Sequence, residues 1–232
     1  MGQGKLIAQE LKHNLECLRL RLEFEEYFSP EGIPFSSTES VAAVVSKQEA
    51  FDMLLAKAEK CQRCALYKTR NKLVFGDGSL SAEIMFVGEA PGRDEDLAGI
   101  PFIGAAGQLL SKIIAAMKLE RKDVFITNVL RCHPPGNRNP SPEEVVSCKP
   151  YLMQLVEIIK PKVICTLGKF AAHTMLNVTN PISRLRGNFY DFNGIKLMPT
   201  FHPAYLLRSP HDKKLVWDDM KKIMKYLIKN ET

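Results

Sequence analysis

"EIMFVGEAPGRDEDLAGIPFIGAAGQLL" (residues 83–110) joins three pieces of an α/β protein in direct succession. An apolar run of strand length comes first, a loop rich in glycine, proline and acidic residues follows, and a helical pattern begins at its end. Open α/β folds place their ligand sites in such loops, at the carboxyl ends of strands. The loop between residues 88 and 104 is therefore a candidate binding site.

Strand-like and helical patterns alternate along the chain on both sides of this stretch. Three further apolar runs, at 124–130, 162–168 and 196–202, alternate with helical patterns at 104–119, 141–160, 169–176 and 212–229. This alternation predicts a parallel sheet covered by helices. The helix at 141–160 has the clearest start, because Ser141, Pro142 and Glu144 form the pattern of a capping box.

The first 45 residues differ in character from the rest of the chain. Helical patterns at 4–28 and 47–60 flank the Pro-, Gly- and Ser-rich segment SPEGIPFSSTESVAA, which predicts an N-terminal extension (1–45) and a main domain (46–232). Leucines at 11, 15, 18 and 22 share one helical face, which either docks on the main domain or meets a partner. The chain shows no signal-peptide pattern and no apolar run of membrane-spanning length, so we expect a cytoplasmic protein.

Composition and charge are those of a globular protein with a mild preference for polyanions. The 232 residues are 45% hydrophobic and 25% charged, and 32 Lys and Arg against 26 Asp and Glu give a net charge of +6. This charge favours nucleic acid as a partner without establishing it. Six cysteines without an export signal indicate a reducing compartment, where clustered thiolates bind metal more often than they form disulfides.

Four of the cysteines form a candidate metal site. Cys61 and Cys64 form a CxxC motif, Cys132 ends a predicted strand, and Cys148 lies in the capped helix. Four thiolates suit either zinc or an iron–sulfur cluster, and the spacing leaves both open, as it leaves open four unrelated buried cysteines. The remaining two, Cys17 and Cys165, are expected to be packing residues.

Polar residues recur where the predicted strands end. Glu89 follows the first strand, Asn128 and Arg131 close the second, Gly168 ends the third, and His202 ends the fourth. Because the carboxyl ends of parallel strands lie at one edge of the sheet, these residues are expected to meet there.

Four motifs in this order, GEAPGRDEDLAGIPFIGAAGQLL, TNVLRCHPPGNRNPSPEE, TLGKFAA and HPAYLLRSP, resemble those of the family 4 uracil-DNA glycosylases, which contain an iron–sulfur cluster. The resemblance runs from about residue 54 to the C-terminus. It implies a three-layer α/β/α sandwich with a short, mainly parallel four-stranded sheet. It also implies a [4Fe–4S] cluster on Cys61, Cys64, Cys132 and Cys148, and monofunctional hydrolysis of the N-glycosidic bond of deoxyuridine in DNA, which starts base-excision repair.

The resemblance assigns roles in reading and releasing the base. An enzyme that acts on a base must extrude it, hold its faces and read its Watson–Crick edge. Phe102 is expected to stack on uracil, the amide of Asn128 to pair with its N3 hydrogen and O4, and His202 to donate to O2 as negative charge develops. The loop positions expected to line the pocket with them are Gly88, Glu89, Ala90 and Glu95.

The sequence leaves alternative roles open for the acidic residues of this loop. More familiar relatives carry an aspartate where this chain has Ala90, so Glu89 either orients the attacking water or only shapes the loop. Glu95 is a candidate for excluding the thymine methyl group, since Gly92 has no side chain to do so. Asp94 and Asp96 are expected to be solvated or to cap a helix.

Contacts with single- or double-stranded DNA are expected around the pocket. The loop after His202 would press Leu206, Leu207 and Arg208 into the DNA. The chain has Ile100 and Ala105 where the family pattern has basic residues. The basic residues that remain for phosphate contacts are Arg131, Arg138, Arg184, Arg186 and Arg208.

Two other functions compete with this assignment. A non-catalytic iron–sulfur DNA-binding module of the same fold is one, and the joint presence of Phe102, Asn128 and His202 disfavours it. A superfamily member that traps the abasic sugar through a histidine in an inserted basic loop is the other, and residues 168–202 show no such insertion. We expect the protein to be a monomer, and the N-terminal extension is a candidate for recruiting a repair or replication partner.

Overall fold

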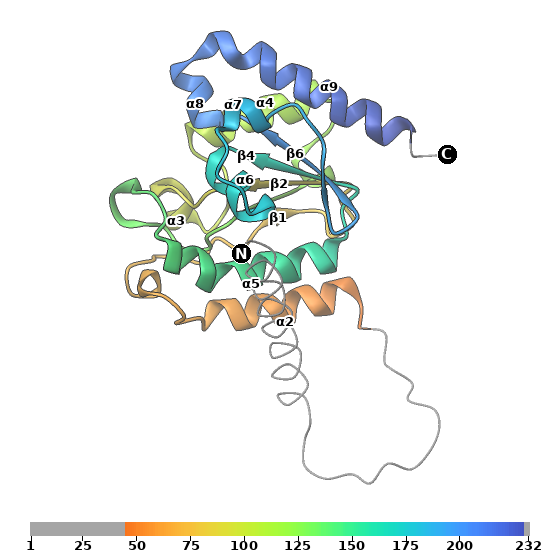
Figure 1. Cartoon of the computed structure of the whole chain (residues 1–232). Coiled ribbons are helices and arrows are strands. Elements are labelled where there is room, and N and C mark those ends of the chain that lie inside the picture. The colour runs from red at the N-terminus through yellow and green to blue at the C-terminus, as the bar shows by residue number, and fades with distance from the viewer. Residues whose placement is uncertain (1–44, 230–232) are drawn as a thin grey trace, which may run out of the picture. The chain divides into compact units, whose positions relative to one another are not determined.

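The computed structural model describes residues 45–229 (Figure 1). The predictions for the N-terminal extension, its leucine stripe and Cys17 lie outside the described residues. None of the helices in the described range is both long and apolar enough to cross a membrane.

A six-stranded sheet of order β1-β3-β2-β4-β6-β5 forms the centre of the fold. The four inner strands are parallel and are the four predicted ones: β2 (Ile84–Gly88), β3 (Phe125–Asn128), β4 (Val163–Leu167) and β6 (Ile195–Thr200). Two short antiparallel strands, β1 (Asp77–Gly78) and β5 (Tyr190–Phe192), add the edges. The prediction of a short, mainly parallel sheet is confirmed, with two edge strands more than expected.

The extra strand β5 follows from a turn signal in the sequence. Asn193 and Gly194 join β5 to β6, and both have positive φ, at 51° and 83°. A two-residue Asn-Gly turn with these angles matches the twist of an antiparallel pair and therefore closes a hairpin. The other edge strand, β1, has only two residues, too few to leave a pattern in the sequence.

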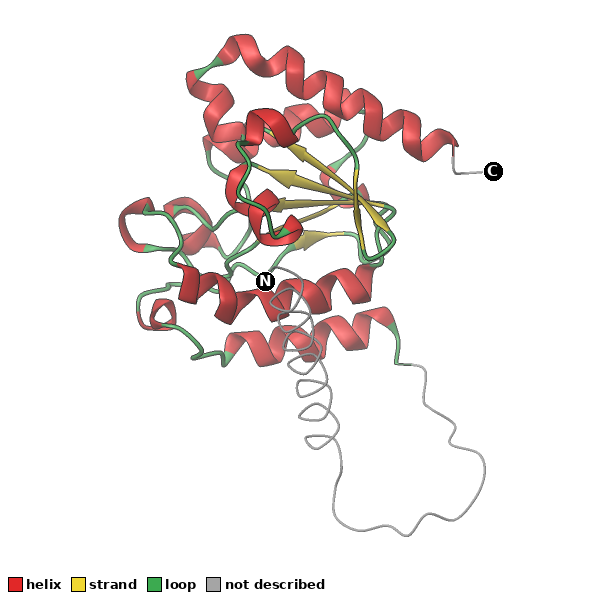
Figure 2. Cartoon of the chain, viewed as in Figure 1, coloured by secondary structure: helices red, strands yellow, loops and turns green. Residues whose placement is uncertain are grey.

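Helices cover both faces of the sheet and make three layers (Figures 1 and 2). One face carries α2 (Lys47–Glu59), α5 (Pro142–Ile159) and α6 (Lys169–Leu176), and the other carries α4 (Ala105–Ala116), α8 (Pro203–Arg208) and α9 (Lys213–Lys229). The short helices α3 and α7 lie in connecting loops, at Arg93–Ala98 and Ile182–Leu185. Single 3₁₀ turns occur at Ala65–Lys68, Arg121–Asp123, Pro135–Asn137 and Pro210–Asp212.

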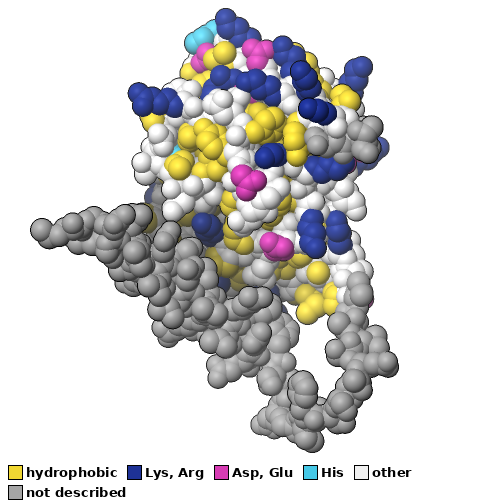
Figure 3. Space-filling view, turned by 45° about the vertical axis from the view of Figure 1, so that its right-hand side comes forward, with side chains coloured by type: hydrophobic (Ala, Val, Ile, Leu, Met, Phe, Trp, Pro, Cys, Tyr) yellow, Lys and Arg dark blue, Asp and Glu magenta, His cyan; other side chains and the backbone are white. Residues whose placement is uncertain are grey.

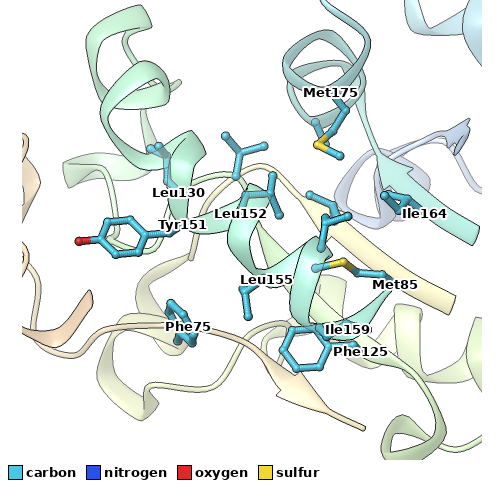
Figure 4. Close-up of a cluster of buried hydrophobic side chains, with 14 of the residues drawn as sticks. Phe75, Met85, Phe125, Leu130, Tyr151, Leu152, Leu155, Ile159, Ile164 and Met175 are labelled. Atoms are coloured by element: carbon cyan, nitrogen blue, oxygen red, sulfur yellow. The ribbon is translucent and has the colours of Figure 1, made fainter. Parts of the chain in front are cut away.

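Two hydrophobic clusters, one on each face of the sheet, hold the layers together. Successive residues of a strand point to opposite faces, so Met85 and Val87 of β2 enter one cluster, and Ile84 and Phe86 enter the other. Figure 4 shows the first cluster, where side chains of the strands meet those of α5. Each large apolar side chain buried in this way stabilises the fold by about 1.5–3 kcal/mol.

The capping box predicted for α5 is present. Ser141 Oγ accepts a hydrogen bond from the Glu144 amide (3.2 Å), and the Ser141 amide donates to Glu144 Oε2 (2.8 Å). These bonds satisfy amide donors that the first turn of a helix otherwise leaves without partners. The cap fixes where α5 begins and therefore where Cys148, two turns further on, lies.

Candidate active site and four-cysteine cavity

The carboxyl ends of the parallel strands open into a cleft of about 900 Å³. Residues predicted from all four strand ends line it, which confirms that they meet at one edge of the sheet. The sequence-predicted residues in the lining are Glu89, Ala90, Glu95, Phe102, Asn128, Arg138, Gly168, His202 and Arg208.

Asn128 ends β3 with its side chain buried in the cleft wall. The residue is only 1% exposed, and its Oδ1 has no hydrogen-bond partner within the described part of the chain. A buried acceptor left in this way costs about 1–3 kcal/mol, so the position suits a ligand that brings an N–H donor. Gly88, at the end of the neighbouring strand, makes room for it: a Cβ there would lie 2.4 Å from Asn128 Oδ1 and 2.5 Å from Phe102 Cζ.

Phe102 is held in an unusual backbone conformation beside Asn128. Its φ is 54°, a left-handed value that non-glycine residues adopt at a cost, typically at functional sites. Arg121 stabilises this turn, because its guanidinium donates to the carbonyls of Pro101 (2.9 Å) and Phe102 (3.1 Å) and pairs with Asp77 (2.9 Å). Sequence reasoning missed Arg121, since nothing local links it to residue 102.

His202 closes the other side of the pocket. Its ring lies against that of Phe102, with centroids 5.7 Å apart and planes tilted by 31°. His202 Nδ1 accepts from the Ala204 amide (3.1 Å), which caps α8 and leaves the ring proton on Nε2. Burial, helped by the charge of Arg208, lowers the pKa of His202 to about 4. The imidazole is therefore neutral at physiological pH and presents an N–H donor.

Glu89 follows β2 and lines the cleft directly. Burial raises the pKa of its carboxyl group, and the positive charge of Lys169 opposes that rise. A carboxylate that has lost part of its hydration is a stronger base and a better partner for positive charge in a substrate. The structure thus brings Glu89 to the cleft together with Asn128 and His202.

Glu95 and Asp96 shape the loop from within. Glu95 Oε1 accepts from the amides of Ile103 (3.1 Å) and Gly104 (3.0 Å) at the start of α4. Its contact with a base stays a prediction, alongside this structural role. The expectation that Asp96 is solvated or caps a helix is wrong: it is 2% exposed, and its carboxylate accepts from the backbone and side-chain amides of Asn71, in the loop before β1.

The residues predicted to contact DNA differ in how accessible they are. Arg208 lines the cleft and Leu207 is 46% exposed, so both are accessible to DNA. Leu206 is fully buried in the second cluster, and Arg186 forms an ion pair with buried Asp219, so the structure does not support a DNA contact for either. Arg138 lines the cleft but bonds the Glu144 carboxylate (2.9 Å).

The four predicted ligand cysteines line a second cavity, on the α2 and α5 side of the sheet. Cys61 and Cys64 come from the segment after α2, Cys132 from the loop after β3, and Cys148 from α5. Burial raises the pKa of Cys132, and raises that of Cys148 to about 11. Cys165 is buried in the second cluster, as predicted for a packing residue.

Two of the four sulfur atoms in this cavity accept hydrogen bonds from arginine residues, one from a side chain and one from a backbone amide. Arg70 Nη1 donates to Cys132 Sγ (3.4 Å), and the Arg131 amide donates to Cys148 Sγ (3.3 Å). Such donors stabilise thiolates and are typical of the surroundings of metal-bound sulfur. Within residues 45–229, no three Cys, His, Asp or Glu side chains converge on one metal-ion position.

Arg131 is buried between the cavity and the cleft. The side chain is 1% exposed, so the expectation that it contacts phosphate is wrong. Its Nη1 donates to Thr127 Oγ1 (2.8 Å) and to the carbonyl of Asn128. Its Nε and Nη2 have no hydrogen-bond partner in the described structure.

Comparisons with known proteins agree on one family. Residues 75–221 match the family model described as the uracil DNA glycosylase superfamily. A type-4 uracil-DNA glycosylase of Archaeoglobus fulgidus is 45% identical over 75% of this chain and 92% of its own length. Proteins of the same name from Saccharolobus solfataricus (42% identical, 76% of this chain, 86% of the relative) and Thermotoga maritima (39%, 79% and 98%) are also similar.

Proposed function

Because the chain belongs to the type-4 branch of the uracil-DNA glycosylase superfamily, we propose that it hydrolyses the bond between uracil and deoxyribose in DNA, leaving an abasic site. The observation that carries this function is the amide of Asn128, buried at the cleft wall with Oδ1 unpartnered within the described residues. Uracil offers an N3–H donor to Oδ1 and an O4 acceptor to Nδ2. Cytosine presents the reverse pattern, an acceptor at N3 and a donor at N4, so this amide discriminates against it.

The neighbouring rings complete the base pocket. Phe102 provides an apolar face next to Asn128, with Gly88 leaving space for both. The neutral imidazole of His202 donates from Nε2 to uracil O2. This hydrogen bond strengthens as the C1′–N1 bond breaks and negative charge builds up on the base, so it lowers the barrier to release.

Glu89 acts on the sugar side of the same bond. Cleavage gives the deoxyribose the character of an oxocarbenium ion, which a nearby carboxylate stabilises. The partly desolvated Glu89 carboxylate lies in the cleft with Asn128 and His202 and also orients the attacking water. The water oxygen bonds to C1′, its proton passes to the carboxylate, and the bonding electrons leave with uracil.

The four cysteines hold a [4Fe–4S] cluster in this proposal. A single zinc ion needs its ligands within about 2.0–2.3 Å of one point, a convergence that no three candidate ligands within residues 45–229 show. A cluster takes one thiolate on each iron, which fits four cysteines arranged around a cavity. When bound, it supplies a cross-link between the segment after α2, the loop after β3 and α5.

DNA is proposed to approach the cleft at the carboxyl edge of the sheet, where Arg208 lies in the lining. Figure 3 draws a different face of the molecule, on which Lys and Arg side chains are more frequent than Asp and Glu, in line with the net charge of +6 that favours a polyanionic partner. Leu207, exposed at the end of α8, enters the DNA beside the extruded nucleotide, and Arg208 contacts its phosphates.

Release of uracil from a labelled oligonucleotide tests this function. We expect the wild-type protein to release uracil, and Asn128→Ala to lower the single-turnover rate by about a hundredfold or more, as loss of a transition-state donor does. Asn188→Ala is the matched control, because this exposed asparagine has only a weak bond to the Arg186 carbonyl (3.4 Å). DNA binding without uracil release would instead identify a non-catalytic module of the same fold.

A further inference from the structure

The arginine buried behind the base pocket has an incomplete set of partners. Arg131 is among the largest fully buried side chains, and its Nε and Nη2 bond to no other group within residues 45–229. No carboxylate in this range forms an ion pair with it. A guanidinium keeps its charge even when buried, and a buried charge is costly unless an anion compensates it.

The surroundings of Arg131 provide one place for such an anion. The side chain lines the cavity formed by Cys61, Cys64, Cys132 and Cys148. The ring of Phe75 lies 5.4 Å from its Cζ and contributes a weak attraction, which does not replace an anion. Four thiolates holding a [4Fe–4S] cluster carry net negative charge, and hydrogen bonds to cluster sulfur adjust the reduction potential.

Arg131 also reaches the base pocket through its remaining N–H groups. Nη1 donates to Thr127 Oγ1 (2.8 Å) and to the carbonyl of Asn128, the residue that reads uracil. Both acceptors belong to the last two residues of β3, where the strand ends at the cleft. A single side chain thus spans from the four-cysteine cavity to the backbone of the base-reading residue.

We propose that Arg131 is a positioning residue that compensates the negative charge of the cluster and, by holding the Asn128 carbonyl, aligns the Asn128 amide with uracil. This proposal rests on the proposed function, since it assumes both the cluster and the base. It gives the cluster a role in base selection without any electron transfer. The cluster holds the guanidinium in place, and the guanidinium holds the end of β3.

The proposal predicts two linked effects of removing the charge. In Arg131→Met, the reduction potential of the cluster shifts to a more negative value, because the reduced, more negative cluster loses a nearby cation. The preference for uracil over cytosine in single-turnover excision falls by about tenfold, the effect of losing a hydrogen bond from a charged group. Voltammetry of the purified holoprotein and paired excision assays measure the two effects.

Two further variants separate charge from alignment. Arg131→Lys keeps the charge without the planar fork, so the potential stays near the wild-type value while the preference for uracil still falls. If Arg131→Met does not fold, the preference for uracil over cytosine is measured in Arg131→Lys instead. Arg70→Met removes another cation that contacts a ligand, Cys132 Sγ, but that has no bond to β3. It is expected to shift the potential with a smaller change in base preference.

Each result decides one part of the account. An unchanged potential and unchanged base preference in both Arg131 variants would overturn the proposal. An equal loss of base preference in Arg70→Met would also overturn it, because the effect would then not pass through Arg131. Failure of the wild-type protein to release uracil overturns the proposed function, whereas the potentials of the variants still show whether Arg131 compensates the cluster.

Discussion

Three glycines decide whether the base pocket exists, because each leaves space that a neighbouring site residue fills. A Cβ on Gly88 would overlap Asn128 and Phe102, and one on Gly107 would lie 1.9 Å from the Phe102 carbonyl oxygen. Gly168 has φ of 87°, and a Cβ there would lie 3.0 Å from that of His202. The base pocket therefore depends on three positions that have no side chain.

Gly88→Ala tests this at the residue scale. The added methyl group displaces Asn128 or Phe102, so we expect the rate of uracil excision to fall by about a hundredfold and the free energy of unfolding by about 1–3 kcal/mol. Gly194→Ala is the control: Gly194 has positive φ in the hairpin between β5 and β6, with nothing within 4 Å of an added Cβ. It loses stability through backbone strain and keeps its rate.

The pH dependence of excision depends on two residues that both act in their deprotonated forms. Glu89 acts as a carboxylate and burial raises its pKa, so the rate falls as pH drops through that raised value, above the ordinary 4.5. His202, with a pKa of about 4, stays neutral through pH 6.5 and adds no loss there. Single-turnover rates of wild type and Glu89→Gln from pH 5 to 8 measure this. An acid limb centred near 6.5 that disappears in His202→Gln would contradict the neutral imidazole.

At the scale of elements, the ends of strands and helices are where sequence reasoning succeeded. The four inner strands, the capping box of α5 and the meeting of strand-end residues all follow from local patterns. The predictions that Leu206 and Arg131 contact DNA and that Asp96 is solvated or caps a helix are wrong, because the surroundings of these residues come from distant segments. Leu206 packs in the second cluster, Arg131 lines the four-cysteine cavity, and Asp96 bonds Asn71. Local pattern shows where a strand or helix ends, but not which of the side chains in the adjoining loops and helices become buried.

The short 3₁₀ turn Arg121–Asp123 acts as a clamp on the Phe102 loop. We expect Arg121→Met to release the strained turn and lower the excision rate by about tenfold, with little effect on the cluster spectrum. Lys122→Met, in the same turn, is the matched control, because Lys122 is exposed and forms an ion pair with exposed Glu120 rather than a bond to the Phe102 loop. Equal rates in the two variants would show that the clamp does not matter.

At the scale of the whole molecule, the segment after α2 meets the loop after β3 and α5, about 70 residues further along the chain, at the four-cysteine cavity, next to the first hydrophobic cluster. In Figure 4, Tyr151 lies at the edge of that cluster with its hydroxyl group directed away from the other labelled side chains. Tyr151 also lines the cavity. A group bound there therefore joins the cysteine-bearing segments to the core that supports the sheet.

Removing the cluster should accordingly destabilise the entire domain. We expect a chelator, under conditions that extract iron, to lower the free energy of unfolding by about 2–5 kcal/mol, on the scale of losing a covalent cross-link. Urea unfolding before and after extraction measures the loss, and Cys148→Ser, treated in the same way, should show a smaller difference. Equal stability of the extracted and untreated wild-type proteins would argue against a cross-linking role.

The central claim is that the amide of Asn128 reads uracil at the carboxyl edge of the sheet. Single-turnover excision of uracil and of cytosine by the wild-type protein and by Asn128→Asp tests it most directly, because the substitution keeps the shape and removes the donor to O4. We predict that uracil excision falls by about a hundredfold and that the preference for uracil over cytosine is largely lost. Unchanged uracil excision and unchanged preference would contradict the claim and place base recognition elsewhere in the cleft.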